Sequence, residues 1–581
     1  MMTQALLSGS LIIFVGLGGC DVQKQEPSDP TVGYCFEYHP GRARGIQITL
    51  RVPGESGDSS RFAVAPSWGG VQNCERFIHD VRARDDQGNP CHISRNGPHG
   101  WKVAHRPGAI LEFAYKLRPA EIDPLADRKT IYEPVVRDDL LHLIGETGMV
   151  YPEWLEDRGP VNIELQWVGF KEHGWNTASS FDAGNGRLHC PLKKFRRALF
   201  LAGKIRVHDR KIRGGLLRVA IQGDDWRFED REMVDVIERI ITTEREFMQD
   251  FSDPYYLVTI VASGPRASPS SYSMSGTCLT NCFAMFLSPG IAVDPPSPHR
   301  QEFLRLLAHE YFHNWNGGKI GTDEAEELVY WFTEGFTDFY ASRVLRRAGL
   351  IDDAQFIERL NETLRSLWLS PVATAPGQTI RGEFWSREEV QKLPYQRGEI
   401  VAVLLDEEIR RASGNRRTLD DFMRELFSPS TRAEPMQTDR LISRMAEWTS
   451  PQFAQSLRQT VVDGALPDPP RQLSEPTADK SEVEHYPYEP GFDIDASIDS
   501  KVVTGVQPGT AAHSAGLRDG QPILAWSIYQ GDPDRQFEMT VHEQRQPRPI
   551  RFYPRGKAIK VPRYTQRMKS RIVENPYFKG G

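Results

Sequence analysis

His309-Glu310-Tyr311-Phe312-His313 is the stretch from which the organisation of this chain can be worked out. Two histidines four residues apart lie on one face of a helix, so both imidazoles can reach a single metal ion. The carboxylate of Glu310 lies beside them, where it can accept a proton from a water molecule at the metal. The stretch therefore predicts a helix that carries a hydrolytic zinc site. The alternative is a chance match in which one histidine is only a hydrogen-bonded core residue.

A third ligand is expected on the following helix. Catalytic zinc takes three protein ligands and keeps one position open for water. We predict a helix from about Glu324 to Ala348, on which Glu334 and Asp338 share a face because they are four residues apart. Glu334 is the best third ligand, and Asp338 can orient a metal-bound imidazole. The prediction is one zinc ion per chain. Other nearby carboxylates have the character of a solvated acidic segment: Glu324, Glu326 and Glu327.

Local signals place the ends of the first helix. Ser297 before Pro298 is a favourable helix start, and Gly317-Gly318 is a plausible stop. Between them, apolar residues recur with helical spacing. The motif is therefore expected on a buried helix of about 20 residues.

These two segments resemble a known family. The chain resembles the glycyl aminopeptidase family of gluzincin zinc metallopeptidases in two stretches. They are H-E-Y-F-H-N-W-N at 309–316 and W-F-T-E-G-F-T-D-F-Y at 331–340. The resemblance covers most of the chain and is strongest from about 250 to 562. It implies a multidomain α+β protein with a β-rich amino-terminal region, a thermolysin-like, mainly helical catalytic domain and a carboxy-terminal PDZ domain. It also implies that His309, His313 and Glu334 bind zinc and that Glu310 is the general base.

A further motif agrees with that family. Leu393 to Glu399 is predicted to open a helix and resembles the family's Y-x-K-G segment, with Arg397 where lysine is common. The resemblance implies that Tyr395 stabilises the tetrahedral oxyanion, a task that suits a phenol hydroxyl. The alternative is an aromatic residue packed at a helix start.

One segment departs from the family pattern. The family usually carries a G-G-L-E-H-like strand whose glutamate holds the free amino group of the substrate. Here the equivalent is G-T-C-L-T-N-C at 276–282, with Thr280 at the position of the glutamate. Gly276, Thr280 and Asn281 are the predicted substrate-binding residues. A neutral threonine does not pair with an ammonium group, so strict aminopeptidase specificity is in doubt. The strand can instead bind an extended peptide through backbone hydrogen bonds.

The beginning of the chain indicates export. Ala5 to Gly19 is a short apolar segment, too short for a membrane span, and ends in L-G-G before Cys20. This resembles a bacterial lipobox, so we predict a lipidated Cys20 and a membrane-anchored protein that faces the periplasm or the outside. Met1 to Ser10 contain neither lysine nor arginine, so a plain signal peptide is the alternative. An exported protein can form disulfides, and the nearest pairs among the other six cysteines are Cys74 with Cys91 and Cys278 with Cys282.

Composition bounds the rest of the molecule. The chain has 581 residues, a formal net charge of −7 and 39% hydrophobic residues, so several globular domains are expected and nucleic acid is not a partner. We expect the following divisions: a signal peptide at 1–19, a tether at 20–31, a β-sandwich-like region at 32–206, the zinc peptidase domain at 207–465, a linker at 466–487, the PDZ domain at 488–565 and a tail at 566–581.

The last domain resembles a bacterial PDZ domain through P-G-T-A-A at 508–512, A-G-L at 515–517 and D-G-Q-P-I-L at 519–524. The resemblance places a carboxylate-binding loop at Gly491, Phe492, Asp493 and Ile494, followed by a strand that pairs with a bound peptide. The alternative is a degenerate PDZ fold that only packs on the peptidase.

The sequence therefore favours a zinc peptidase that acts on peptides or proteins. Within that class, an aminopeptidase and an endopeptidase or oligopeptidase both remain open, with the loss of the amine-holding glutamate favouring the second. A membrane-tethered peptide-binding scaffold with an inactive peptidase domain is the alternative from another class.

Overall fold

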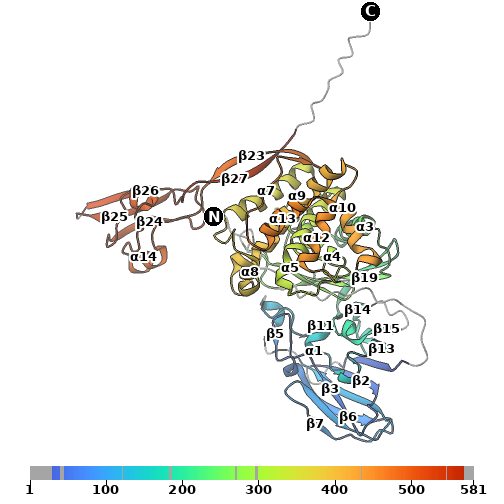
Figure 1. Ribbon diagram of the computed structural model, residues 1–581. Coiled ribbons are helices and arrows are strands. Elements are labelled where there is room, and N and C mark those ends of the chain that lie inside the picture. Colours follow the sequence, from blue (N-terminus) through green and yellow to red (C-terminus); the bar gives the residue numbers. More distant parts are fainter. Residues whose placement is uncertain are drawn as a thin grey trace, which may run out of the picture.

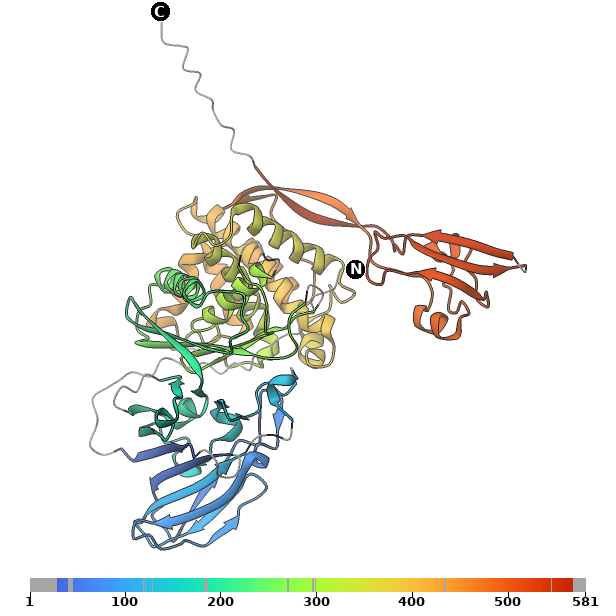
Figure 2. The ribbon, with the colours of Figure 1, turned by 180° about the vertical axis from the view of Figure 1, so that it is seen from behind.

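The computed structural model describes residues 29–39, 45–118, 120, 122–127, 129–181, 186–268, 271–294, 297, 299–432, 435–544 and 546–567. Three parts follow one another along the chain (Figure 1). A β-rich amino-terminal region leads into a body of helices, and a smaller carboxy-terminal lobe projects from that body. The predicted order of a β-rich region before a helical part is confirmed. The view from behind shows the same separation of the three parts (Figure 2).

The amino-terminal region is a stack of antiparallel and mixed sheets. Its largest sheet has six strands in the order β15-β13-β1-β2-β9-β6, beside four-stranded sheets β12-β3-β8-β7 and β10-β11-β16-β14 and the pair β4-β5. In β2, buried residues alternate with more exposed ones, as expected for a sheet with one face on a core. The strands are β1 Thr31–Glu37, β2 Ile46–Pro53, β3 Ser59–Ala63, β4 Ser67–Trp68, β5 Val71–Gln72, β6 Ile78–Asp85, β7 Ile93–Arg95, β8 Gly100–Ala104, β9 Ile110–Leu117, β10 Val135–Val136, β11 Leu140–Ile144, β12 Tyr151–Pro152, β13 Pro160–Val168, β14 Asn176–Ser179, β15 Arg187–Pro191 and β16 Leu199–Gly203, with the short helices α1 Gly145–Gly148 and α2 Leu192–Arg196.

A five-stranded sheet joins this region to the helices. Its order is β17-β18-β19-β21-β20, in which β18, β19 and β21 run parallel and β20 is an edge strand. One face of β21, with Ala284 and Phe286, packs into the amino-terminal core, whereas the other, with Phe283 and Met285, packs against the helices. The strands are β17 Ile205–Ile212, β18 Gly215–Gln222, β19 Tyr255–Ala262, β20 Met274–Leu279 and β21 Cys282–Leu287.

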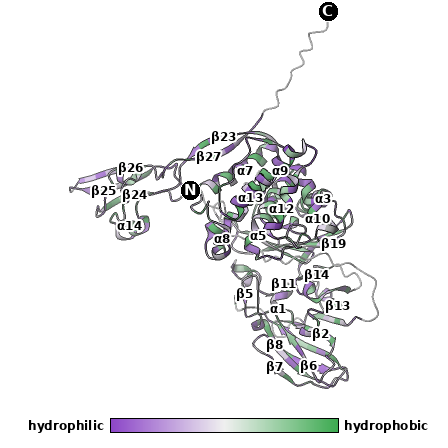
Figure 3. Ribbon diagram, in the orientation of Figure 1, coloured by the Kyte–Doolittle hydropathy of each residue, from purple (hydrophilic) through white to green (hydrophobic). Residues whose placement is uncertain are grey.

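The helical body covers one face of this sheet, and its helices change repeatedly between hydrophobic and hydrophilic residues (Figure 3). This pattern buries one stripe of each helix in a shared core. The helices are α3 Asp230–Met248, α4 Arg300–Phe312, α5 Glu326–Thr333, α6 Gly335–Arg347, α7 Asp353–Trp368, α8 Gly377–Glu383, α9 Glu388–Ser413, α10 Leu419–Phe427, α11 Pro429–Arg432, α12 Thr438–Trp448 and α13 Pro451–Val461.

The carboxy-terminal lobe is connected to the body by two long strands (Figure 1). β22 Gln472–Ser474 and β23 Thr477–His485 form a sheet with β27 Ile559–Gln566, which lies against α7. The linker predicted at 466–487 is therefore largely sheet. Its composition suggested a loop, but the strands are fixed by pairing with β27, which is about 80 residues further along the chain.

The lobe itself contains a three-stranded sheet, β24 Ile523–Ser527, β25 Phe537–Glu543 and β26 Gln546–Phe552, and the helices α14 Ile494–Ser500 and α15 Ala511–Ser514. The strand expected after the Gly491–Ile494 loop is wrong, because α14 occupies that segment. The Asp493 side chain accepts a hydrogen bond from the Ala496 backbone N–H at 3.0 Å and so caps the helix. Phe492 and Ile494 are buried in the core of the lobe.

The six cysteines from Cys35 to Cys282 are free, so the two predicted disulfides are wrong. The register of β20 and β21 explains the second case. Cys278 pairs with Phe283 and faces the helices, whereas Cys282 pairs with Leu279 and faces the amino-terminal core. Within the described residues, no helix is long and apolar enough to cross a membrane. Cys20, the predicted lipidation site, lies outside the described residues.

Candidate metal centre

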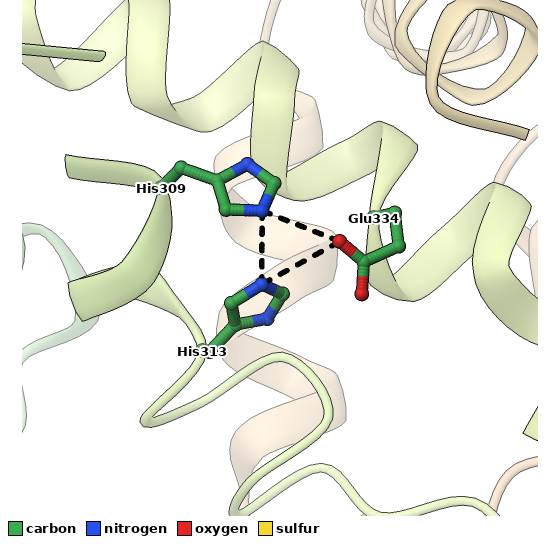
Figure 4. A group of neighbouring side chains, drawn as sticks. All are labelled: His309, His313 and Glu334. Carbon is green, nitrogen blue, oxygen red and sulfur yellow. Dashed lines mark hydrogen bonds and ion pairs between the residues drawn. The ribbon is translucent and has the colours of Figure 1, made fainter. Parts of the chain in front are cut away.

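Three side chains converge on one point inside the helical body (Figure 4). The Nε2 atoms of His309 and His313 are 3.0 Å apart. The Glu334 Oε2 atom is 3.2 Å from His309 Nε2 and 3.6 Å from His313 Nε2. All three side chains are buried. In the described part of the chain, they form the one group whose ligand atoms are close enough to hold a metal ion.

The first helix of the site is shorter than predicted. α4 begins at Arg300, three residues after Ser297, and ends at Phe312, with His313 as its last cap. His309 and Glu310 thus lie on the last helical turn. The chain turns just after His313, where the Asn316 and Ile320 backbones form a bridge.

The single helix predicted from Glu324 to Ala348 is two helices. α5 ends at Thr333 and α6 begins at Gly335, so Glu334 stands at the break between them. The break coincides with a close backbone contact: a Cβ atom on Gly335 would collide with the backbone of Gly398 in α9. This tertiary contact brings α9 against the helix break that holds Glu334. Sequence periodicity alone does not reveal the contact.

Asp338 contacts the first histidine, as the sequence suggested. His309 Nδ1 donates to Asp338 Oδ1 at 2.7 Å, so Nε2 is the nitrogen that faces the metal position. The same Asp338 oxygen accepts a second hydrogen bond, at 2.6 Å, from Arg305 Nη1. Arg305 lies one helical turn before His309 and was not singled out from the sequence. Its spacing of four residues from His309 is the signal that would have found it.

Asn316 plays the corresponding part for the second histidine. His313 Nδ1 donates to the Asn316 carbonyl at 3.1 Å. The buried Asn316 side-chain amide donates to the Phe332 and Thr333 carbonyls at 2.9 and 3.2 Å, just before Glu334. Asn316 therefore links the turn that follows His313 to the end of α5, just before Glu334. Asn316 ends the H-E-Y-F-H-N-W-N motif, whose sequence alone gives this residue no role.

Glu310 is buried beside the ligands, and its Oε2 has no hydrogen-bond partner among the described residues. Burial raises the pKa of its carboxyl to about 7, with the His309 cation acting in the opposite direction. The Cys278 thiol of β20 lies 2.8 Å from the Glu310 carbonyl, so the edge strand lies directly against the end of α4. A carboxylate with this pKa can both accept and return a proton near neutral pH.

Tyr395 also reaches the site. Its ring is stacked on the His309 ring at a centroid distance of 6.2 Å and an interplanar angle of 20°. The helix predicted to open at Leu393 begins earlier, because α9 starts at Glu388 and Pro394 lies within it. Pro394 has no backbone N–H to donate to the carbonyl four residues earlier, so the first turns of α9 lack one helical hydrogen bond.

The predicted substrate-binding residues lie on or beside β20. Gly276 is within the strand, and its carbonyl accepts a hydrogen bond from the Tyr132 hydroxyl at 3.1 Å. Thr280 is in the turn, and its hydroxyl donates to the Lys194 carbonyl at 2.8 Å. Asn281 has a positive φ of 48° in the same turn. Cys278, which sequence reasoning did not assign to the site, contacts the Glu310 carbonyl through its thiol.

The donors fit zinc. Two imidazole Nε2 atoms and one carboxylate oxygen are the ligand set of many catalytic zinc sites. The Glu334 carboxylate is buried with its Oε2 against the two histidine Nε2 atoms, where a bound cation would offset the cost of burying its charge. Burial acts to lower the pKa of His309, but the Asp338 and Glu334 carboxylates outweigh it and raise that pKa to about 10. A bound metal would displace the proton held there.

Two segments match family models. Residues 40–195 match the peptidase M61 N-terminal domain, and residues 302–380, which include the three candidate ligands, match M61 glycyl aminopeptidase. No curated protein matches the chain.

Solved structures of two bacterial proteins are similar to the chain to different degrees. An aminopeptidase N family protein from Idiomarina loihiensis is similar over 91% of this chain and 97% of that chain, with a TM-score of 0.66 and 15% identity. An M1 zinc metallopeptidase from Deinococcus radiodurans is similar over 76% of this chain and 96% of that chain, with a TM-score of 0.46 and 12% identity. The first likeness establishes a shared fold.

Proposed function

We propose that this protein is a zinc-dependent peptidase of the M61 type, with His309, His313 and Glu334 as the metal ligands and Glu310 as the general base. The convergence of three buried donor atoms beside an unpartnered carboxylate is the observation that carries the proposal. The matched M61 segments and the shared fold of the Idiomarina protein support it.

When bound, zinc supplies a Lewis acid that polarises a carbonyl and lowers the pKa of water. The residues of the chain perform the proton transfers. Glu310 takes a proton from the attacking water and passes it to the leaving amine, a sequence that its pKa of about 7 favours. Tyr395, stacked on His309, donates its hydroxyl hydrogen to the oxyanion that develops on the scissile carbonyl.

Strand β20 is the proposed peptide-binding edge. It is the last strand of its sheet, so one side of its backbone has no strand partner, although the Gly276 carbonyl accepts from Tyr132, and Cys278 sets the strand against the end of α4. An extended peptide that pairs with this edge would pass beside Glu310. Thr280 and Asn281 would then fix the turn that ends this edge, and Gly276 would lie within the edge itself.

The test of the activity is Glu310→Gln. This variant keeps the shape of the side chain but removes the base, so turnover of a peptide substrate should fall by about 10²- to 10⁴-fold. Zinc content, measured by atomic absorption, should remain at one ion per chain. Retained turnover would overturn the role of Glu310, and absence of zinc from both proteins would overturn the metal site.

For specificity, we propose an endopeptidase or oligopeptidase rather than a strict aminopeptidase. Thr280 stands where the family has its amine-holding glutamate, and its hydroxyl is engaged with Lys194. Two matched peptides, one with a free amino terminus and one acetylated, decide the question by mass spectrometry of their products. Internal cuts in both support the proposal. Single residues released only from the free peptide would make the enzyme an aminopeptidase.

We also propose that the protein is exported and held at a membrane through lipid on Cys20, as the L-G-G-C sequence suggests. Radiolabelled palmitate should be incorporated by the wild-type chain, and Cys20→Ala should not be labelled.

Peptide capture by the Gly491–Ile494 loop has less support, because α14 occupies the segment where a peptide-pairing strand would be needed.

A further inference from the structure

Arg397 is an unusual buried cation two residues after Tyr395. It lies within α9, and its side chain is among the largest fully buried ones in the molecule, with 1% of the residue exposed. Its Nη2 donates to the Ala373 and Ala375 carbonyls at 3.1 and 2.8 Å, in the loop between α7 and α8. Nε and Nη1 have no partner among the described residues. Three of the five guanidinium N–H groups are therefore unsatisfied by the protein.

The other buried arginines provide the comparison. In the described part of the chain there are four more, and acidic groups act on each of them: Arg196 beside Glu146 and Glu156, Arg197 near Glu146 and Glu326, Arg245 near Asp250 and Asp253, and Arg343 between Asp406 and Asp420. Arg397 has no such acid. Burial alone acts on it and lowers its pKa to about 10, so the guanidinium is still charged at neutral pH.

A buried charge without a counter-ion is strongly destabilising, and so are buried N–H groups without acceptors. Arg397 has both an uncompensated positive charge and, at Nε and Nη1, N–H groups without acceptors among the described residues. We propose that Arg397 is an anion-binding residue and that a small monovalent anion, chloride in most solutions, binds at Nε and Nη1. This proposal stands independently of the peptidase function.

The size and charge of the ligand follow from the site. A single uncompensated positive charge calls for a single negative charge, since no other charged group among the described residues acts on Arg397. With 1% of the residue exposed, the guanidinium is shielded from solvent, which favours a small anion over a phosphate or a carboxylate-bearing metabolite. A halide ion accepts several N–H groups at once and has no geometry of its own to satisfy.

The position of Arg397 gives the anion a structural consequence. The adjacent Gly398 is the residue whose backbone packs on Gly335 and Trp331, at the break that carries Glu334. An anion at Arg397 would hold α9 against the loop at residues 373–375. It would thereby stabilise the position of α9 at its backbone contact with Gly335 and Trp331.

The first test is thermal unfolding of the full-length protein in sodium chloride, sodium bromide and sodium gluconate at equal concentration, so that charge screening is the same. Chloride and bromide should raise Tm by a few degrees in a saturable way, while gluconate should not. Equal Tm values in all three salts would overturn the proposal.

Variants assign the effect to the site. Arg397→Met should lose the difference between chloride and gluconate. Arg397→Lys keeps the charge and can still donate to the two carbonyls, so it should fold and show a weaker chloride effect. Arg343→Met is the matched control, because it removes another buried arginine, one that has acidic partners. It should melt earlier but keep the full chloride effect. A chloride effect that persists in Arg397→Met would place the anion elsewhere and refute the assignment.

A direct measurement settles the matter even where a variant fails to fold. Crystals of the wild-type protein grown in bromide should show an anomalous difference peak within hydrogen-bond distance of Arg397 Nε and Nη1. Ordered water at that place, with no anomalous signal, would show that solvent satisfies the guanidinium and would overturn the anion site.

Discussion

The metal centre and the carboxy-terminal lobe are held in place in opposite ways. Both histidines of the metal centre use their second ring nitrogen for a contact: His309 with Asp338 and His313 with Asn316. These contacts come from different helices and turns, all within the same large core. The lobe has its own core of 11 buried residues and joins the body through β23 and β27 (Figure 1).

The difference shows where the fold requires precision. A metal site fails if its ligands shift by a fraction of an ångström, so its supports are buried, short and redundant. The contacts that orient the two histidines come from residues 305–338 and not from the lobe. We therefore expect damage to the supports of the metal centre to be large and local, and damage to the lobe to leave the centre unchanged.

The largest effect is expected from Asp338→Asn. The amide can still accept from His309 Nδ1, but it loses the negative charge that orients the imidazole and pairs with Arg305. Zinc affinity should fall by roughly 10- to 100-fold. Competition with a chelator of known affinity measures the change.

Asp406→Asn is the control for this prediction, because Asp406 is also buried in the helical body and pairs with Arg343 and Arg410. It should lose stability but bind zinc as tightly as the wild type. Equal losses of zinc affinity in the two variants would mean that any buried carboxylate supports the site, and the comparison between regions would fail.

Asp250 supports the turn after His313 and should show its effect as pH-dependent stability. It accepts hydrogen bonds from Trp315 Nε1 and Ser252 and pairs with Lys319. Burial acts to raise its pKa, but Lys319 and Ser252 outweigh burial and lower the pKa to about 2. Because the folded-state pKa is depressed, the stabilisation is fully present above the unfolded-state pKa of about 3.9 and is lost as pH falls toward 2.

The gap in unfolding free energy between wild type and Asp250→Asn should thus be about 2 kcal/mol at pH 7. It should close between about pH 4 and pH 2. Urea unfolding at a series of pH values measures it. A gap that stays constant down to pH 2 would show that the charge of Asp250 is not what stabilises the turn.

Arg305→Gln should have a smaller effect on the metal. The guanidinium acts on His309 only through Asp338, and glutamine can still donate a hydrogen bond to that carboxylate. We expect a roughly three- to tenfold loss of zinc affinity, below the range for residues that contact a ligand directly. Arg300→Gln, at the start of the same helix, should bind zinc like the wild type. A loss as large as that of Asp338→Asn would make Arg305 an equal partner in the site.

Local periodicity was enough to predict the core of the metal centre. His309 and His313 share a helix face through a spacing of four, and α4 carries His309 on its last turn and His313 as its carboxy-terminal cap. Glu334 and Asp338 were found on the same grounds. Such features depend on residues that are near one another in the chain, so the sequence contains the information directly.

The rest depends on distant contacts. The break at Glu334 reflects a backbone contact with Gly398, and β23 is a strand because it pairs with β27. Neither contact leaves a local pattern. Helix α14 replaced a predicted strand because Asp493 caps it, a signal that the resemblance to a PDZ domain concealed. Asn316 also acts through a distant contact, with the Phe332 and Thr333 carbonyls, whereas the spacing of four between Arg305 and His309 is a local signal.

The smallest effect is expected from removing the lobe. His485 at the end of β23 pairs with Ile559 at the start of β27, so residues 486–558 can be replaced by Asn-Gly, which closes the two strands as a tight hairpin. The contact of β27 with the body remains, because the Asn361 side chain hydrogen-bonds both the N–H and the carbonyl of Tyr564. We expect zinc content to be unchanged and kcat/KM for a short peptide to stay within about twofold of the wild-type value, since no ligand or ligand support among the described residues lies in the lobe.

A tenfold loss of kcat/KM on short peptides would show that the lobe acts on the metal centre through α7 and would end the distinction between the two regions. A loss confined to long protein substrates would instead give the lobe a role in substrate capture and leave the metal centre independent of it.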